Sequence, residues 1–142
     1  MTAHPRPAPD ADNAPFWAAC REHRLLIQRC DGCGAWRFPP RPRCPICRAD
    51  QASWQQASGR GAVFSFTVCH PPVLPAFADR TPYNVIVVRL EEGPLLVSNL
   101  VDAEATVGMP VEVCFVDVDN ELTLPQFRPV PPVGVEPTLD RV

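Results

Sequence analysis

Two Cys-x-x-Cys pairs constrain this chain more than any other feature of its sequence. Cys30 and Cys33 form the first pair, Cys44 and Cys47 form the second, and ten residues separate the pairs. A Cys-x-x-Cys turn presents two thiolates from one tight loop, and two such turns complete a tetrahedral metal shell with bonds of about 2.3 Å. The spacing therefore predicts a four-cysteine metal site on a short hairpin.

The predicted site is closed, because four thiolates leave no open coordination position for water or substrate. Water activation and Lewis-acid chemistry by the metal are not expected. We expect structural Zn2+, and iron is the alternative because four thiolates also hold iron. The remaining cysteines, Cys20, Cys69 and Cys114, are expected to be small buried hydrophobic residues.

The cysteine usage also favours a cytoplasmic protein, because paired cysteines in a reducing compartment favour metal over disulfide. The first sixteen residues, MTAHPRPAPDADNAPF, contain no apolar run of the kind that a signal peptide carries. No stretch approaches the roughly 18 apolar residues of a membrane span. We therefore expect no membrane association.

The charge balance excludes several chemistries. All thirteen basic residues are arginine and the net charge is −3. Without lysine the chain can form no lysine Schiff base and lacks the lysine of a Walker A loop. The acidic balance also disfavours unspecific binding to nucleic acid, which depends on many cationic contacts to phosphate.

The sequence predicts that the N-terminal part is an arm followed by a short helix. Residues 1–12 are mostly Pro, Ala and Asp and are expected to be a disordered arm. Residues 13–28 are expected to form a helix over about 14–24 and a lead-in strand, with Asn13 as N-cap and Pro15 in the first turn. One face of this helix carries the spacing i, i+3, i+4, i+7 at Phe16, Ala19, Cys20 and His23.

The second half of the chain predicts five short strands, at residues 62–70, 83–90, 95–101, 111–118 and 121–127. In the first of these, Phe64, Phe66 and Val68 alternate with polar residues and are expected to share one face, with both phenylalanines inside a barrel. Five strands without a long helix favour a small barrel such as an OB-fold, with an SH3-like barrel as the alternative. Residues 130–142 are expected to be a proline-rich tail.

These residues resemble the DUF35 family. The resemblance rests on PFWAACREHRLLIQRCDGCGAWRFPPRPRCPIC, GAVFSFTV, PYNVIVVRLEEGPLLVSNLV, GMPVEVCF and LPQFRP, and runs from about Phe16 to Pro129. It implies a mainly β fold: a short N-terminal helix, a rubredoxin-like zinc ribbon at residues 29–58 and a five-stranded OB-fold barrel at residues 59–129. The resemblance implies that the four cysteines of the family's zinc ribbon correspond to Cys30, Cys33, Cys44 and Cys47 in this chain.

The resemblance also implies a function. Members of this family are typically non-catalytic subunits that associate with thiolase-like enzymes, including steroid side-chain aldolases, or with MaoC-type enoyl-CoA hydratases. They support assembly and acyl-CoA handling in a hetero-oligomer, in some cases around a shared CoA ligand. The chain departs from the family in lacking lysine, so any cationic contact to a CoA phosphate must come from arginine.

Candidate contacts with a partner or with CoA follow from residue type and position. They are Trp17, Trp36, Arg37, Phe38, Arg41, Phe77, Arg80 and Phe127. Trp36 and Phe38 lie on the ribbon hairpin, where little chain surrounds them, so at least one should pack on the helix or on a partner.

Two other functional classes are alternatives to a subunit role. An independent enzyme needs a nucleophile with a base, paired acids or an open metal, and the sequence offers none of these, so no catalytic residue is expected. Single-stranded nucleic-acid binding is the alternative function, because OB-folds often stack bases on aromatic residues in a basic groove. Phe64 and Phe66 are expected to lie in the barrel interior, where they could not stack on bases. The sequence also shows no stripe of basic residues beside exposed aromatic residues, so single-stranded nucleic-acid binding is disfavoured.

Overall fold

The computed structural model describes residues 4–131. Its elements are α1 (Ala14–Arg21), β1 (Leu26–Cys30), β2 (Trp36–Arg37), β3 (Ala52–Gln56), β4 (Arg60–Cys69), the 3-10 helix η1 (Pro75–Arg80), β5 (Tyr83–Leu90), β6 (Leu95–Ser98), β7 (Pro110–Asp117) and β8 (Thr123–Pro129). The predictions for residues 1–3 of the arm and 132–142 of the tail lie outside the described residues. The predicted fold class is confirmed: a mainly β chain with one short N-terminal α-helix, a ribbon and a five-stranded barrel sheet.

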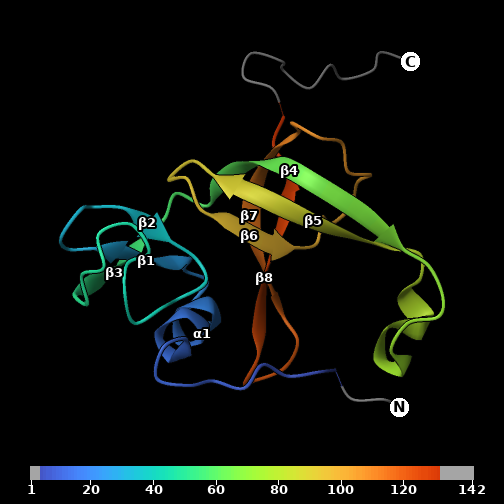
Figure 1. Ribbon diagram of the computed structural model, residues 1–142. Helices are drawn as coiled ribbons and strands as arrows, with labels where there is room; N and C mark the ends of the chain where they lie inside the picture. Colours follow the sequence, from blue (N-terminus) through green and yellow to red (C-terminus); the bar gives the residue numbers. More distant parts are fainter. Residues whose placement is uncertain (1–3, 132–142) are drawn as a thin grey trace.

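The strands form two antiparallel sheets (Figure 1). The ribbon sheet has the order β2-β1-β3, and the barrel sheet has the order β6-β5-β4-β7-β8. The barrel curls so that the end of β6 meets β8: a parallel bridge joins Leu100 to Phe127, and the Val101 N–H donates to the Phe127 carbonyl at 2.8 Å. The closed curl places Phe127 at the centre of the core with no exposed surface.

Ribbon, helix and barrel share one apolar core. Phe16 and Cys20 from α1 and Ile27 from β1 belong to the same buried cluster as Ile86 and Val88 of the barrel. Burial raises the pKa of the Cys20 thiol to about 12, so this cysteine stays a neutral packing residue. The ribbon is thereby fixed at its base to the barrel, with its cysteine turns at the far end.

The N-terminal end of α1 is not capped by the Asn13 side chain, contrary to the prediction from the sequence. Asn13 makes no side-chain cap bond to α1; its Oδ1 accepts a hydrogen bond from the Asp10 N–H at 2.8 Å instead. Arg6 forms an ion pair with Asp119 in the turn between β7 and β8. The helix begins at Ala14, with Pro15 in its first turn as expected.

His23 does not lie on the buried helix face, contrary to the sequence pattern. The helix ends at Arg21, and His23 has a left-handed backbone (φ 57°), which turns its ring away from the core. Its Nε2 lies 2.9 Å from Asp117 Oδ1, and its ring stacks on Phe115. The hydrogen bond from His23 lowers the pKa of Asp117 below its usual range.

Strand β4 contains a bulge that the sequence pattern did not reveal. Val63 pairs with Val88, but the next pair joins Ser65 to Val87, so Phe64 is an extra residue on β4. A bulge of this kind changes the phase of the side-chain alternation along its strand. Residues before and after Phe64 therefore follow different registers relative to the core.

The prediction that Phe64 and Phe66 both point into the barrel is wrong. Phe66 pairs with the fully buried Ile86 and faces the inner side, whereas Phe64 lies on the outer side beneath the Arg89 guanidinium, 4.8 Å from its ring centre. The exposed fractions of Phe64, Phe66 and Val68 are 49%, 40% and 46%. Phe66 and Val68 stay exposed because β4 runs past the part of the barrel that would cover them.

Within residues 4–131, no helix is long and apolar enough to cross a membrane.

Gly61 is the position at which the barrel most directly requires glycine. A Cβ there would lie 2.4 Å from the Arg89 carbonyl oxygen across the β4–β5 pair. We predict that Gly61→Ala lowers the free energy of unfolding by about 1–3 kcal/mol, since the two strands would have to separate. Urea unfolding followed by tryptophan fluorescence measures the change. Ser65→Ala, on an exposed part of the same strand, is the control and should change stability by less than about 0.5 kcal/mol.

Candidate metal centre and barrel cleft

The four cysteines of the two pairs converge at the far end of the ribbon. The Sγ atoms of Cys30, Cys33, Cys44 and Cys47 all lie within 4.8 Å of one another. Cys30 Sγ is 3.4 Å from Cys47 Sγ, and Cys33 Sγ is 3.6 Å from Cys44 Sγ. A tetrahedral ion with bonds of about 2.3 Å places its sulfurs about 3.8 Å apart, so the donor set fits a single metal ion.

Main-chain amides support the sulfurs from inside each turn. The Gly32 N–H points to Cys30 Sγ at 3.3 Å, and the Ile46 N–H points to Cys44 Sγ at 3.4 Å. The main-chain N–H groups of Cys47 and Ile46 lower the pKa of the Cys44 thiol to about 6, because they stabilise the thiolate. The second turn thus favours the deprotonated form of Cys44, which is the form that a metal binds.

The strands β2 and β3 hold these turns in register, and the sequence analysis did not identify either strand. β1 pairs with β3 from Leu26–Gln56 to Cys30–Ala52 and with β2 through Gln28–Arg37 and Arg29–Trp36. β2 has only two residues, too few for a periodic pattern, and β3 lacks a run of β-branched residues.

The ribbon arginines divide between buried and exposed positions. Arg37 is only 6% exposed: its Nε donates to Gln28 Oε1 at 2.9 Å and its Nη2 donates to the Arg41 carbonyl at 2.8 Å. Arg37 therefore holds the hairpin from within. Arg41 is exposed, and within the described residues its own side chain makes no hydrogen bond or ion pair.

The predicted aromatic contacts also fall in different places. Phe38 packs on α1, with its ring centre 5.2 Å from that of Phe16, which confirms that at least one hairpin aromatic packs on the helix. Trp36 is half-buried beneath the Arg29 guanidinium, and Trp17 is half-buried against the core. Phe127 is core and has no surface for a partner.

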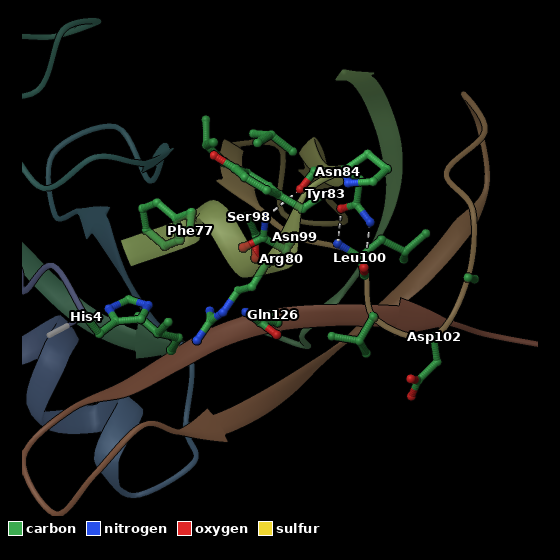
Figure 2. A pocket seen from close by; sticks show the side chains of 16 residues that line it. His4, Phe77, Arg80, Tyr83, Asn84, Ser98, Asn99, Leu100, Asp102 and Gln126 are labelled. Atoms are coloured by element: carbon green, nitrogen blue, oxygen red, sulfur yellow. Dashed lines mark hydrogen bonds between the residues drawn. The ribbon is translucent and has the colours of Figure 1, made fainter. Parts of the chain in front are cut away.

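A cleft of about 610 Å³ opens at the other end of the molecule, between η1, the start of β5, the segment after β6, and β8 (Figure 2). Phe77 and Arg80, both candidates from the sequence, line it. Phe77 packs on Tyr83 and on His4, with ring centres 5.8 and 5.6 Å apart. The cleft is the place where these two candidates come together.

The frame of the cleft is held by two asparagines that the sequence analysis did not single out. Asn84 Nδ2 donates to the Leu100 carbonyl at 2.8 Å, and the Leu100 N–H donates to Asn84 Oδ1 at 2.7 Å. Asn99 Nδ2 donates to the Asn84 carbonyl at 2.6 Å (Figure 2). Polar residues inside predicted strands are the signal in the sequence that could have found them.

Several polar groups of the cleft are not used in this frame. Among the described residues, the side chains of Arg80, Asp102 and Gln126 make no hydrogen bond or ion pair, and all three line the cleft. Apolar walls with a few unpaired polar groups are typical of small-molecule sites. Within the described residues, the cleft therefore combines apolar walls with one unpaired guanidinium and one unpaired carboxylate.

Comparison with known families matches both halves of the chain. Residues 17–52 match the family described as "ChsH2, rubredoxin-like zinc ribbon domain", and residues 54–116 match "ChsH2, C-terminal OB-fold domain". A solved structure titled "Ltp2-ChsH2(DUF35) aldolase" contains a chain that is 45% identical, with a TM-score of 0.80 over 87% of this chain and 98% of that one.

Two curated relatives carry the names of hydratase subunits. A "Probable enoyl-CoA hydratase alpha subunit" from Thermomonospora curvata is 45% identical over 90% of this chain. The "3-oxo-4,17-pregnadiene-20-carboxyl-CoA hydratase alpha subunit" of Mycobacterium tuberculosis is 37% identical over 79% of this chain. The chain spans only 40% and 36% of the lengths of these two proteins.

The four-cysteine site yields a direct prediction. Cys44→Ser should lower the metal content from about one ion per chain to almost none, because a structural ion contributes about 10–16 kcal/mol only when its ligand set is complete. Inductively coupled plasma mass spectrometry of untagged protein measures the metal, and amide exchange over β1–β3 reports the loosened ribbon. Cys114→Ser, on barrel strand β7, should keep the full metal content. Full metal content in Cys44→Ser would contradict the four-cysteine site.

Proposed function

The chain belongs to the DUF35 family, with the zinc ribbon and OB-fold of ChsH2, and from this premise we propose that it is a non-catalytic subunit of an acyl-CoA-transforming enzyme. The observation that carries the proposal is the match over 98% of one chain in the solved structure named "Ltp2-ChsH2(DUF35) aldolase". Relatives named as hydratase alpha subunits support the same kind of role.

The absence of a catalytic arrangement in the described residues supports the non-catalytic part of the proposal. The nearest approach to one is His23 beside Asp117, but the Thr123 hydroxyl also donates to Asp117 Oδ1, at 2.7 Å. Both groups bond to the same carboxylate, so the imidazole does not activate the hydroxyl. The metal ligands form a closed set as well.

We propose Zn2+ as the metal, with a structural role. The match to a family described as a zinc ribbon supports zinc over iron. Four thiolates at tetrahedral spacing would hold the ion without an open position, so it would stabilise the ribbon and take no part in a reaction. Reduced cysteines suit a reducing compartment, and we propose that the chain acts in the cytoplasm.

The proposed partner is a thiolase-like aldolase subunit, with a MaoC-type hydratase subunit as the second candidate. The aldolase is preferred because this chain covers nearly all of its DUF35 relative in that complex, whereas it covers less than half of each hydratase subunit. The half-buried aromatics Trp17 and Trp36 and the exposed Arg41 are proposed contacts with this partner. Within that complex the chain would support assembly and the handling of the acyl-CoA.

We propose that the barrel cleft is the site at which this chain contacts the acyl-CoA. Its apolar wall includes Phe77 and Tyr83, which suit the uncharged part of a ligand, and Arg80 offers a guanidinium without an ion pair in the described structure. A guanidinium binds phosphate oxygens through charge-assisted hydrogen bonds. In a chain without lysine, Arg80 is the cleft's own cation for such a contact.

The partner proposal predicts the outcome of co-expression. The full chain, produced with a thiolase-like subunit or separately with a MaoC-like subunit of the same organism, should co-elute stoichiometrically with one of them in size-exclusion chromatography. An unrelated OB-fold protein serves as control. If neither subunit binds while the chain binds single-stranded DNA with a steep salt dependence, the nucleic-acid alternative replaces the proposal.

The proposal for the cleft predicts how removal of the Arg80 charge changes the affinity for CoA. In the assembled complex, Arg80→Ala should weaken CoA binding by about tenfold, the loss expected for a charge-assisted hydrogen bond to phosphate of about 1.4 kcal/mol. Isothermal titration calorimetry with CoA measures the affinity. Arg21→Ala, an exposed arginine at the end of α1, is the matched control and should bind CoA normally. Equal affinities of all three proteins would exclude Arg80 as a contact.

A further inference from the structure

Strand β4 has a long edge without a sheet neighbour. It pairs with β7 only from Arg60 to Ala62, whereas it pairs with β5 as far as Cys69–Tyr83. Figure 1 shows β4 and β5 running beyond the barrel as a two-stranded arm. We call residues 65–69 on the side away from β5 the free β4 edge. Within residues 4–131, no main-chain hydrogen bond to this edge is present.

The free β4 edge favours one kind of occupant, an extended strand. Every second residue of an antiparallel strand turns both its N–H and its carbonyl away from its one neighbour. A row of such donors and acceptors pairs fully only with another strand. Native proteins usually protect edges of this kind with charged residues, proline or a short length.

The side chains of the free β4 edge lack this protection. Residues 61–78 include no Asp, Glu, Lys or Arg. Phe66 and Val68 are 40% and 46% exposed. Beside the start of the edge, Val107 is 69% exposed, and the adjacent Gly108 N–H donates to the Val63 carbonyl at 2.8 Å. Exposed apolar side chains next to unpaired main-chain groups indicate a surface that another chain covers.

We propose that the occupant is a second copy of this chain, whose free β4 edge pairs antiparallel with the first about a two-fold axis at Thr67. In that register Phe66 lies opposite Val68 of the second copy, and Val68 lies opposite its Phe66. Thr67 lies opposite Thr67, and Ser65 lies opposite Cys69. A two-fold interface is self-complementary in this way, since each contact occurs twice.

The register suits the residues that it brings together. Aromatic with β-branched residues and threonine with threonine are favourable cross-strand pairs, at roughly 0.2–1 kcal/mol each. The apolar pairs share the inner face and the hydroxyl groups of Ser65 and Thr67 share the outer face. Because residues 65–69 include no Asp, Glu, Lys or Arg, the paired strands themselves bring no like charges together. The two barrel sheets would become one continuous sheet of ten strands.

The pairing leaves the barrel cleft accessible. The cleft is lined from β5, β6 and its following segment, β8, η1 and His4, and no β4 residue contributes to it. The free β4 edge lies on the side of β4 away from β5, although Val68 is the cross-strand partner of Asn84, which lines the cleft. Since no β4 residue lines the cleft, the dimer is compatible with the proposed function.

Sedimentation velocity of the full chain at micromolar concentrations tests the proposal. The wild-type chain should sediment as a dimer, and Val68→Lys should sediment as a monomer because it places two like charges at the interface. Val97→Lys is the matched control: Val97 is also an exposed valine, on β6, away from the free β4 edge, and this variant should remain a dimer. The metal content and circular dichroism of Val68→Lys show whether it is folded.

A second variant tests the register. Thr67→Cys should form a disulfide-linked dimer under mild oxidation, seen by intact mass under non-reducing conditions, whereas Ser58→Cys, before the start of β4, should not. A monomeric wild-type chain, or a dimer that Val68→Lys leaves intact, would overturn the proposal. Protection of the free β4 edge only in the presence of a catalytic subunit would also overturn it. Failure of the chain to bind any catalytic subunit would affect the proposed function alone.

Discussion

The convergence of four thiolates is the constraint on which the ribbon half of the structure depends. Its turns have little apolar surface of their own: Cys30 and Cys44 are buried, whereas Cys33, Cys47 and the neighbouring Ile46 are exposed. One ion joined to all four sulfurs would therefore take the place of a hydrophobic core at this end. At the other end of the ribbon, Leu25 and Ile27 belong to the core that the ribbon shares with the barrel. With the proposed ion bound, both ends of the ribbon would be fixed, and with them its position relative to the barrel.

Much of the fold and of the metal centre could be predicted from the sequence because their signals are local. The cysteine spacing defines the metal site, and the residues of β5 were predicted at their observed bounds, 83–90. The signal failed in β4, where one extra residue at Phe64 changes the alternation and leaves Phe66 inside but uncovered. A bulge depends on pairing with another strand, and no periodic pattern within β4 reveals it. Sequence spacing could not predict the cleft either, since its walls come from distant segments.

The molecule presents three surfaces with different chemistry. The ribbon offers half-buried tryptophans and exposed arginines around a closed metal site, the cleft offers an apolar wall with one free guanidinium, and the arm offers an uncharged strand edge. None of them brings together a nucleophile and a base in the described residues. This combination is compatible with the proposed function, in which the chain binds other molecules and the reaction takes place on a different subunit.

Reconstituted turnover tests this account most directly. The catalytic subunit and this chain are purified separately, and acyl-CoA conversion is measured for each alone and for the stoichiometric mixture. The account predicts that this chain alone shows no turnover and that the mixture exceeds the catalytic subunit alone. Turnover by this chain alone, or a mixture no more active than the catalytic subunit by itself, would contradict it.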